Sequence, residues 1–208
     1  MIANHNYAGP ARLLAGLIVL IAVGSVLLQL ALNLRSGGSV IEGIWILARY
    51  FTILTNLLVA VVFATIAIGR AVSPRMLLAS VAAIAGVGLV YHALLAHLYV
   101  QVGLEIVADQ GVHTAVPALS VAWFIAFAPT QALRWRDTLF VMIWPTLYCV
   151  YALVRGAASG IYPYPFVDAT VLEPGQMAIN IAGLTLFFLL LGLALFAAVR
   201  LRFRAARS

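Results

Sequence analysis

Charged residues are scarce in this chain of 208 residues, where they make up 9% of the sequence while hydrophobic residues make up 65%. A soluble domain carries about 25% charged residues. So few charges cannot cover the surface of a globule, which excludes a soluble enzyme, and the high apolar content excludes a disordered tail. Long apolar runs joined by short polar segments instead indicate an integral, multi-pass membrane protein.

Lysine is absent, so all twelve basic residues are arginines, and the formal net charge is +6. These arginines are dispersed between apolar runs and form no basic face studded with aromatic residues, which excludes a nucleic-acid partner. Cysteine is nearly absent: Cys149 is the only one, which excludes an intramolecular disulfide. Arginine-only, alanine-rich usage favours a bacterial source, so we expect the bacterial inner (cell) membrane.

Six apolar runs are long enough for a helix to cross a hydrocarbon core about 30 Å thick. We therefore expect residues 1–208 to form a single all-α integral membrane domain, a six-transmembrane-helix bundle. The predicted spans cover residues 13–33, 46–69, 76–98, 113–131, 138–156 and 177–199. The first run is too long for the apolar segment of a signal peptide, so we interpret it as a retained span.

The distribution of charge predicts the orientation of these spans. Most arginines fall on the side shared by the two termini and by the loops after the second and fourth spans. They are Arg12, Arg70, Arg75, Arg134, Arg136, Arg200, Arg202, Arg204 and Arg207. The acidic residues fall on the other side, apart from Asp137. By the positive-inside rule, both termini are expected to be cytoplasmic.

Polar residues inside the spans gather near their outer ends. Counting from the cytoplasmic end of the second span puts Thr52 about one turn below the outer interface. The same counting puts His92 about one turn inside the third span, and His113 opens the fourth. At 100° per residue, Arg49 and Asn56 share one arc of the second span with Thr52, and the opposite arc is apolar. This arc is expected to face the bundle.

A hydroxyl and a histidine at similar depth on neighbouring helices can form a nucleophile–base pair. An imidazole accepts a proton near neutral pH, so His113 is the candidate base for Thr52. Asp109 or Asp168 would orient the ring. Arg49 or Asn56 would stabilise an oxyanion. Two simpler interpretations stay open: Thr52 hydrogen-bonds back to its own helix at the Ala48 carbonyl, and the histidines are structural.

Two further patterns bear on the site. No chelating spacing joins the histidines and acids, so we expect neither a metal nor a cofactor. Residues 162–168 read Tyr-Pro-Tyr-Pro-Phe-Val-Asp, a stiff strip of proline and aromatic residues before the last span. This strip is either a lid over an outer pocket or an anchor at the headgroup level.

Three segments together resemble the androgen-induced protein family of six-helix membrane proteins. They are Arg49-Tyr50-Phe51-Thr52, Gly111-Val112-His113-Thr114 and Tyr164-Pro165-Phe166. The longer segments 50–56 and 162–168 look like its bacterial branch, the predicted six-transmembrane (Pr-six-Pr) proteins. Animal members are described as threonine hydrolases that cleave fatty acid esters of hydroxy fatty acids. By motif, the resemblance implies that the essential threonine is Thr52 and the essential histidine is His113.

We therefore predict a membrane-embedded lipid-ester hydrolase with Thr52 as nucleophile and His113 as base. Arg49, Asn56, His92, Asp109 and Asp168 are supporting candidates, and the partner is a membrane lipid or amphiphilic ester. The alternative is a non-catalytic lipid-binding or sensor protein with the same outer cavity. A transporter is favoured least, because the inner half has no ionisable residues and no paired broken helices mark a midplane site. The oligomeric state is left open.

Overall fold

The computed structural model describes residues 7–35, 37–98, 100–129 and 133–205, with side chains as far as residue 202. Within these ranges every regular element is a helix and no strand occurs. Five helices are long and apolar enough to cross a membrane, and the bent pair α2–α3 makes a sixth if it is counted as one span. The fold is therefore that of a multi-pass helical membrane protein.

Several elements follow one another without a loop, so one membrane-crossing segment can contain more than one kind of helix. The elements in chain order are α1 (Gly9–Leu34), α2 (Val40–Leu47), α3 (Phe51–Ala67), α4 (Pro74–Val90), the π-helical turn η1 (Tyr91–Leu95), the 3-10 turn η2 (Ala96–Leu98), α5 (Leu104–Gln110), the π-helical turn η3 (Gly111–Ala115), α6 (Val116–Phe127), the 3-10 helix η5 (Trp135–Met142), α7 (Ile143–Ser159), the 3-10 turn η6 (Pro165–Val167) and α8 (Pro174–Ala205).

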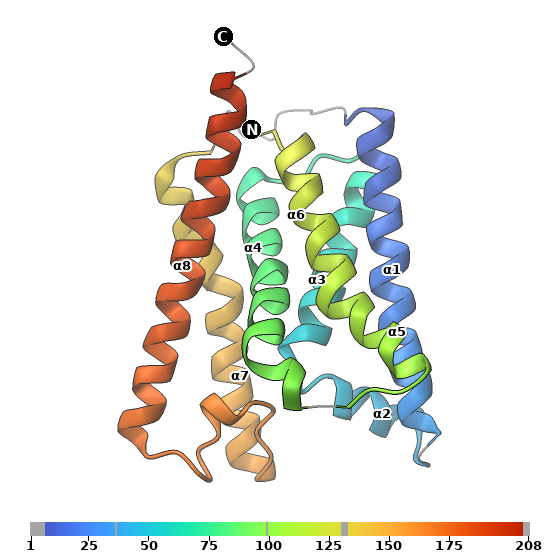
Figure 1. Ribbon diagram of the computed structural model, residues 1–208, viewed down its shortest axis with the longest axis vertical. Helices are drawn as coiled ribbons and strands as arrows, with labels where there is room; N and C mark the ends of the chain where they lie inside the picture. Colours follow the sequence, from blue (N-terminus) through green and yellow to red (C-terminus); the bar gives the residue numbers. More distant parts are fainter. Residues whose placement is uncertain (1–6, 36, 99, 130–132, 206–208) are drawn as a thin grey trace.

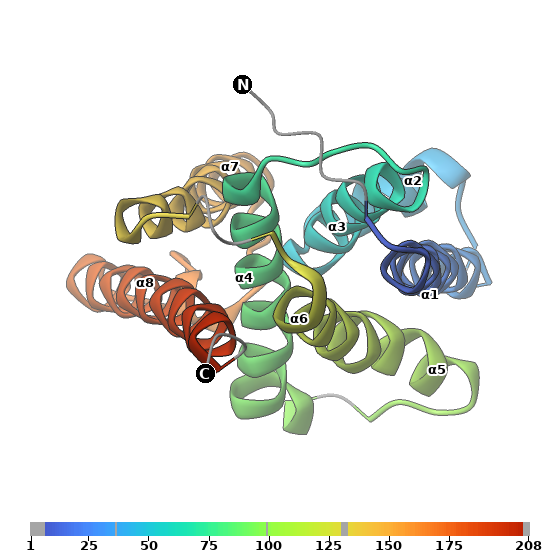
Figure 2. The ribbon, with the colours of Figure 1, turned by 90° about the horizontal axis from the view of Figure 1, so that it is seen from above.

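Helix α4 is the centre of the bundle, as Figures 1 and 2 show, with α1, α3 and α6 on one side and α7 and α8 on the other. It is rich in small residues, which let neighbouring helices approach closely. An added Cβ at Gly86 would lie 2.3 Å from the Phe188 ring of α8, and one at Gly88 would lie 3.0 Å from Pro117 of α6. Any larger residue at Gly86 would force the Phe188 ring to move.

The two ends of the bundle differ in composition. The beginning of α1 and the end of α8 lie at one end (Figure 1). Arg12 lies at the beginning of α1, and Arg200 and Arg202 lie near the end of α8. Arg12 donates to the Ala67 carbonyl, and Arg75 forms a 2.7 Å ion pair with Asp137. Arg207 lies outside the described residues, and the side chain of Arg204 is not described. We call the opposite end, where α3 begins and α4 ends, the site end.

Two of the predicted spans are wrong in a way that matters for function. Residues 46–69 do not form one straight helix, because α2 and α3 meet at an angle of 96°. The predicted arc that joined Arg49 to Thr52 therefore does not exist. The span predicted at 113–131 begins nine residues earlier, at Leu104, so His113 lies within the helix and not in its first turn. Its predicted last residues, 130–131, lie outside the described residues.

The other four spans differ from their predictions by a few residues at their ends. Residues 13–33 fall within α1, and residues 76–98 run from α4 through η2. Residues 138–156 fall within the continuous segment of η5 and α7, and residues 177–199 fall within α8. The helices are longer than the apolar runs because polar residues continue a helix beyond the hydrocarbon core.

Candidate active site

Three side chains of α7 hold the break between α2 and α3. They donate hydrogen bonds to carbonyls at the end of α2: Tyr148 to Arg49 at 2.7 Å, Tyr151 to Ala48 at 2.9 Å and Arg155 to Trp45 at 2.5 Å. In an unbroken helix the Ala48 carbonyl would instead accept the N–H of Thr52. The break therefore frees the first N–H groups of α3 and puts Thr52 in its first turn.

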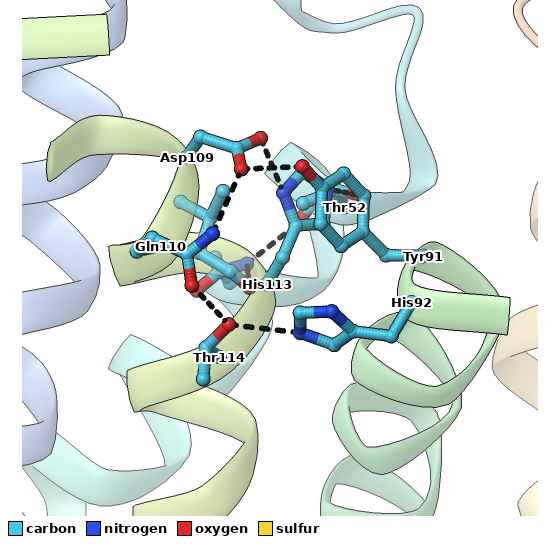
Figure 3. Close-up of polar contacts among 9 residues, drawn as sticks. Thr52, Tyr91, His92, Asp109, Gln110, His113 and Thr114 are labelled. Atoms are coloured by element: carbon cyan, nitrogen blue, oxygen red, sulfur yellow. Dashed lines mark hydrogen bonds and ion pairs between the residues drawn. The ribbon is translucent and has the colours of Figure 1, made fainter. Parts of the chain in front are cut away.

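Two π-helical turns face each other across the site and carry its aromatic and imidazole rings (Figure 3). Within η3, the Val116 N–H donates to the Gly111 carbonyl, five residues back. Pro117 has no N–H to donate to the His113 carbonyl. That carbonyl faces α4, since an added Cβ at Gly88 would lie 3.0 Å from it. The π-helical turn η3 and the lack of a side chain at Gly88 together allow His113 to pack against the end of α4.

A chain of hydrogen bonds links Thr52, His113 and Asp109. The Oγ1 atom of Thr52 lies 3.2 Å from Nε2 of His113, and Nδ1 of His113 lies 2.9 Å from Oδ1 of Asp109. Thr52 and Asp109 are 8% and 5% exposed. With the ring proton on Nδ1 donated to the carboxylate, Nε2 is free to accept the threonine proton. This is the geometry of a nucleophile, base and orienting acid.

Tyr91 of η1 supports this chain in two ways (Figure 3). Its hydroxyl donates to Oδ2 of Asp109 at 2.5 Å. Its ring stacks on the His113 ring, with centroids 3.8 Å apart and planes inclined by 10°. Tyr91 therefore holds both the carboxylate and the imidazole. Rotation of the His113 ring away from Thr52 would lose its stacking on Tyr91 and its hydrogen bond with Asp109.

Asn56 lies one turn beyond Thr52 in α3 and is fully buried. Its amide donates to the Thr52 carbonyl at 2.9 Å and to the Val112 carbonyl of η3 at 3.2 Å. It therefore ties the helix that carries the hydroxyl to the turn that carries the imidazole. Its Oδ1 has no hydrogen-bond partner among the described residues.

His92 forms a second threonine–histidine contact beside the first (Figure 3). Its Nε2 lies 2.9 Å from Oγ1 of Thr114, which donates to Oε1 of Gln110 at 2.7 Å. The amide of Gln110 in turn donates to Asp109 at 3.5 Å. His92 and Thr114 are exposed, so this chain lies outside the buried one and joins it through the hydrogen bond between Gln110 and Asp109.

Arg49 and Asp168 are not brought to Thr52. Within the described ranges, neither residue forms a hydrogen bond or an ion pair with Thr52, His113 or Asp109. Asp168 instead closes a local turn, accepting from the N–H and hydroxyl of Thr170 at 2.8 and 2.6 Å. The Nε atom of Arg49 is buried without a hydrogen-bond partner, and the carbonyl of Arg49 accepts from Tyr148.

An apolar cavity of about 360 Å³ begins at Thr52 and extends between α4, α7 and α8. Its lining includes Val87, Cys149 and Phe188, one from each of these helices. Tyr164 and Val167, from the proline–aromatic strip, also line it. The strip therefore forms part of the cavity wall. Thr52 is a polar group in a largely apolar surface, an arrangement typical of ligand sites.

Tyr164 and Tyr91 contribute to the site but were not predicted as site residues. The Phe51 N–H donates to the Tyr164 hydroxyl at 3.0 Å. Burial raises the pKa of Tyr164 to about 12, although hydrogen bonds with Thr52 and Phe51 oppose the rise. Tyr164 lies in the strip that was singled out, so a signal existed. No pattern marked Tyr91, because the stacking depends on how α4 packs against η3.

Metal binding has no basis in the described part of the chain. No group of three or more histidine, cysteine, aspartate or glutamate side chains is gathered there as a metal would require. The free Cys149 lies in the cavity wall.

Comparisons with known proteins leave the site to be judged on its own geometry. No family model, no curated protein and no solved structure matches this chain.

Proposed function

We propose that this protein is a membrane-embedded lipid-ester hydrolase with Thr52 as the nucleophile, His113 as the base and Asp109 as the orienting acid. One observation carries the proposal: the Thr52–His113–Asp109 chain is buried, and its threonine lines an apolar cavity. Thr52 does not hydrogen-bond back to the Ala48 carbonyl, which accepts from Tyr151 instead. Its hydroxyl is thus directed to an imidazole, as a threonine nucleophile requires.

The proposed reaction has two steps, acylation of Thr52 and hydrolysis of the acyl-threonine. The Thr52 oxygen attacks the ester carbon while His113 takes the hydroxyl proton, and the carbonyl π electrons move to the carbonyl oxygen. The intermediate collapses, the alkoxide leaves, and His113 gives it the proton. Water then attacks the acyl-threonine, again losing a proton to His113, and the acid leaves as Thr52 regains that proton. Asp109 stays ionised and stabilises the imidazolium throughout.

The cavity supports a long-chain acyl group as the part of the substrate nearest Thr52. Its walls come from apolar residues of three helices, so an alkyl chain would bury its surface there at about 25 cal/mol per Å². We propose an ester with a long acyl chain, and fatty acid esters of hydroxy fatty acids are the first substrates to test. This choice also follows the resemblance to the androgen-induced protein family and its bacterial branch.

We further propose that both termini are cytoplasmic and that the site end faces the outer side of a bacterial inner membrane. The support is the collection of arginines at the beginning of α1 and α4 and near the end of α8, at the opposite end of the bundle, which the positive-inside rule assigns to the cytoplasm. Substrate then reaches Thr52 from the outer leaflet.

A lipid-binding or sensor protein is the second candidate, and the cavity is the observation that favours it, since holding an acyl chain needs no nucleophile. The two functions are separated by assaying the purified protein in liposomes with long-chain fatty acid esters of hydroxy fatty acids. We expect release of free acid by the wild type and covalent labelling of Thr52 by an alkyl fluorophosphonate, read by mass spectrometry of the labelled peptide. A tightly co-purified lipid without turnover or labelling would contradict the hydrolase.

A further inference from the structure

The Tyr164 hydroxyl occupies the N-terminal end of α3, next to Thr52. It accepts the Phe51 N–H at 3.0 Å and also interacts with the backbone and side chain of Thr52. The Ala48 carbonyl, which would otherwise accept the Thr52 N–H, accepts from Tyr151 of α7. The Leu47 carbonyl, which would otherwise accept the Phe51 N–H, accepts from the Tyr50 N–H. Tyr164, Thr52 and Phe51 all line the apolar cavity. The phenol therefore lies beside the candidate nucleophile on the side where a substrate carbonyl would enter.

The N–H groups at the start of α3 determine how the Tyr164 hydroxyl can donate a hydrogen bond. A phenolic oxygen accepts through its lone pairs and donates one proton. The Phe51 N–H donates to the oxygen, and the side chains of Thr52 and Tyr148 also hydrogen-bond with the Tyr164 hydroxyl. To act on a substrate, the phenol proton must point to the substrate oxygen and not to these neighbours. Donation to the phenol oxygen also strengthens donation by its O–H, because hydrogen bonds in a chain polarise one another. With a pKa raised to about 12 by burial, Tyr164 is a neutral donor across the working range of pH.

We infer that the Tyr164 hydroxyl is a catalytic residue that stabilises the oxyanion formed when Thr52 attacks the ester. This inference rests on the proposed hydrolase function. As the carbonyl π electrons move to oxygen, the Tyr164 O–H donates a hydrogen bond to that oxygen and keeps its proton. The threonine proton stays on His113 until the alkoxide leaves. The positive end of the α3 dipole lies at the same point and favours the same negative charge.

The decisive measurement compares a ligand that forms an oxyanion with one that does not. A long-chain trifluoromethyl ketone adds to a nucleophile and gives a tetrahedral oxyanion, whereas the matching methyl ketone binds as a ketone. Tyr164→Phe removes the donor and keeps the ring. We expect it to lower kcat by about 10²–10³, with little change in KM. The preference for the trifluoromethyl ketone should fall by a similar factor, while methyl ketone affinity stays within threefold.

The matched control is Tyr162→Phe, the same substitution two residues earlier in the same strip. The Tyr162 ring packs on Gly156, away from Thr52, so kcat and both ketone affinities should stay within twofold of the wild type. A structural loss at Tyr164 would instead weaken both ketones together. If Tyr164→Phe does not fold, 3-fluorotyrosine at position 164 keeps the hydroxyl and makes it a stronger donor. The ketone preference should then rise.

The outcomes separate the two proposals. Absence of turnover and of trifluoromethyl ketone preference in the wild type would reject the hydrolase itself. Turnover by the wild type together with an unchanged ketone preference in Tyr164→Phe, or in the fluorotyrosine protein, would reject only the role of Tyr164. A selective loss of trifluoromethyl ketone affinity supports both.

Discussion

Two threonine–histidine pairs lie side by side at the site end, and the shorter contact is the less suited to catalysis. Thr114 is 2.9 Å from His92, whereas Thr52 is 3.2 Å from His113. The hydroxyl proton of Thr114 is committed to Gln110, so this oxygen can only accept from His92. Thr52 faces an imidazole whose other nitrogen is held by a carboxylate. In the proposed mechanism, the direction of the hydrogen bond, and not its length, distinguishes the nucleophile.

The pairs differ in burial as well. His92 and Thr114 are exposed, while Asp109 is buried and the side chain of His113 is 16% exposed. In a buried site from which water is excluded, electrostatic interactions are stronger than in water. A buried chain of hydrogen bonds with a fixed direction is thus suited to proton transfer. The exposed chain of the same residue types instead supports the buried one.

The largest expected effect comes from removing the nucleophile or base of the buried pair. Thr52→Ala and His113→Ala should each lower kcat by about 10⁴ or more, because no other hydroxyl is activated. Thr114→Ala and His92→Ala are the matched controls and should keep kcat within about threefold. The measurement is ester turnover in liposomes, with folding checked by thermal unfolding. Equal losses in both pairs would mean that the two pairs do not differ in function.

The next largest effect is expected from changing Asp109, the acid of the buried chain. Asp109→Asn should lower kcat by about 10²–10⁴, because an amide can donate to Nδ1 and so hold the wrong tautomer of His113. Gln110→Ala, the adjacent residue of the exposed chain, should change kcat by less than about fivefold. A pre-steady-state burst gives the acylation rate, which is where the loss should appear. Full activity in Asp109→Asn would remove the acid from the proposed mechanism.

Substitutions of Tyr91 separate the effect of its hydrogen bond to Asp109 from the effect of its stacking on His113. Tyr91→Phe keeps the ring on His113 and loses the donor to Asp109, so we expect kcat to fall by about tenfold, near the value of a charged hydrogen bond. Tyr91→Leu loses both contacts and should fall further. If Phe and Leu behave alike, the ring contributes nothing and only the hydroxyl positions the acid.

The smallest effect concerns the close approach of α4 to η3. Gly88→Ala adds a Cβ 3.0 Å from the His113 carbonyl, so η3 must move by a few tenths of an ångström. We expect kcat to fall a few-fold and Tm to fall by a few degrees. Gly16→Ala is the control, because nothing lies within 4 Å of its added Cβ. An unchanged kcat in Gly88→Ala would show that the position of His113 tolerates such a shift.

The sequence predicted the all-helical, multi-pass class and four of the membrane-crossing segments to within about a turn or two at their ends. It also singled out Thr52, His113 and Asp109, because polar residues at one depth in an apolar chain are few. It did not predict the α2–α3 break. Neither proline nor glycine marks that position, and the donors that hold it come from α7, about 100 residues away.

The apolar periodicity of single segments is local, so the chain alone determined which residues span a membrane and at which end polar groups collect. Which hydroxyl faces which imidazole depends on the order and rotation of packed helices. That was decided only by the tertiary structure, through Asn56, Tyr91 and the glycine face of α4. Contacts between distant segments set the direction of each hydrogen bond, and this direction distinguishes Thr52 from Thr114.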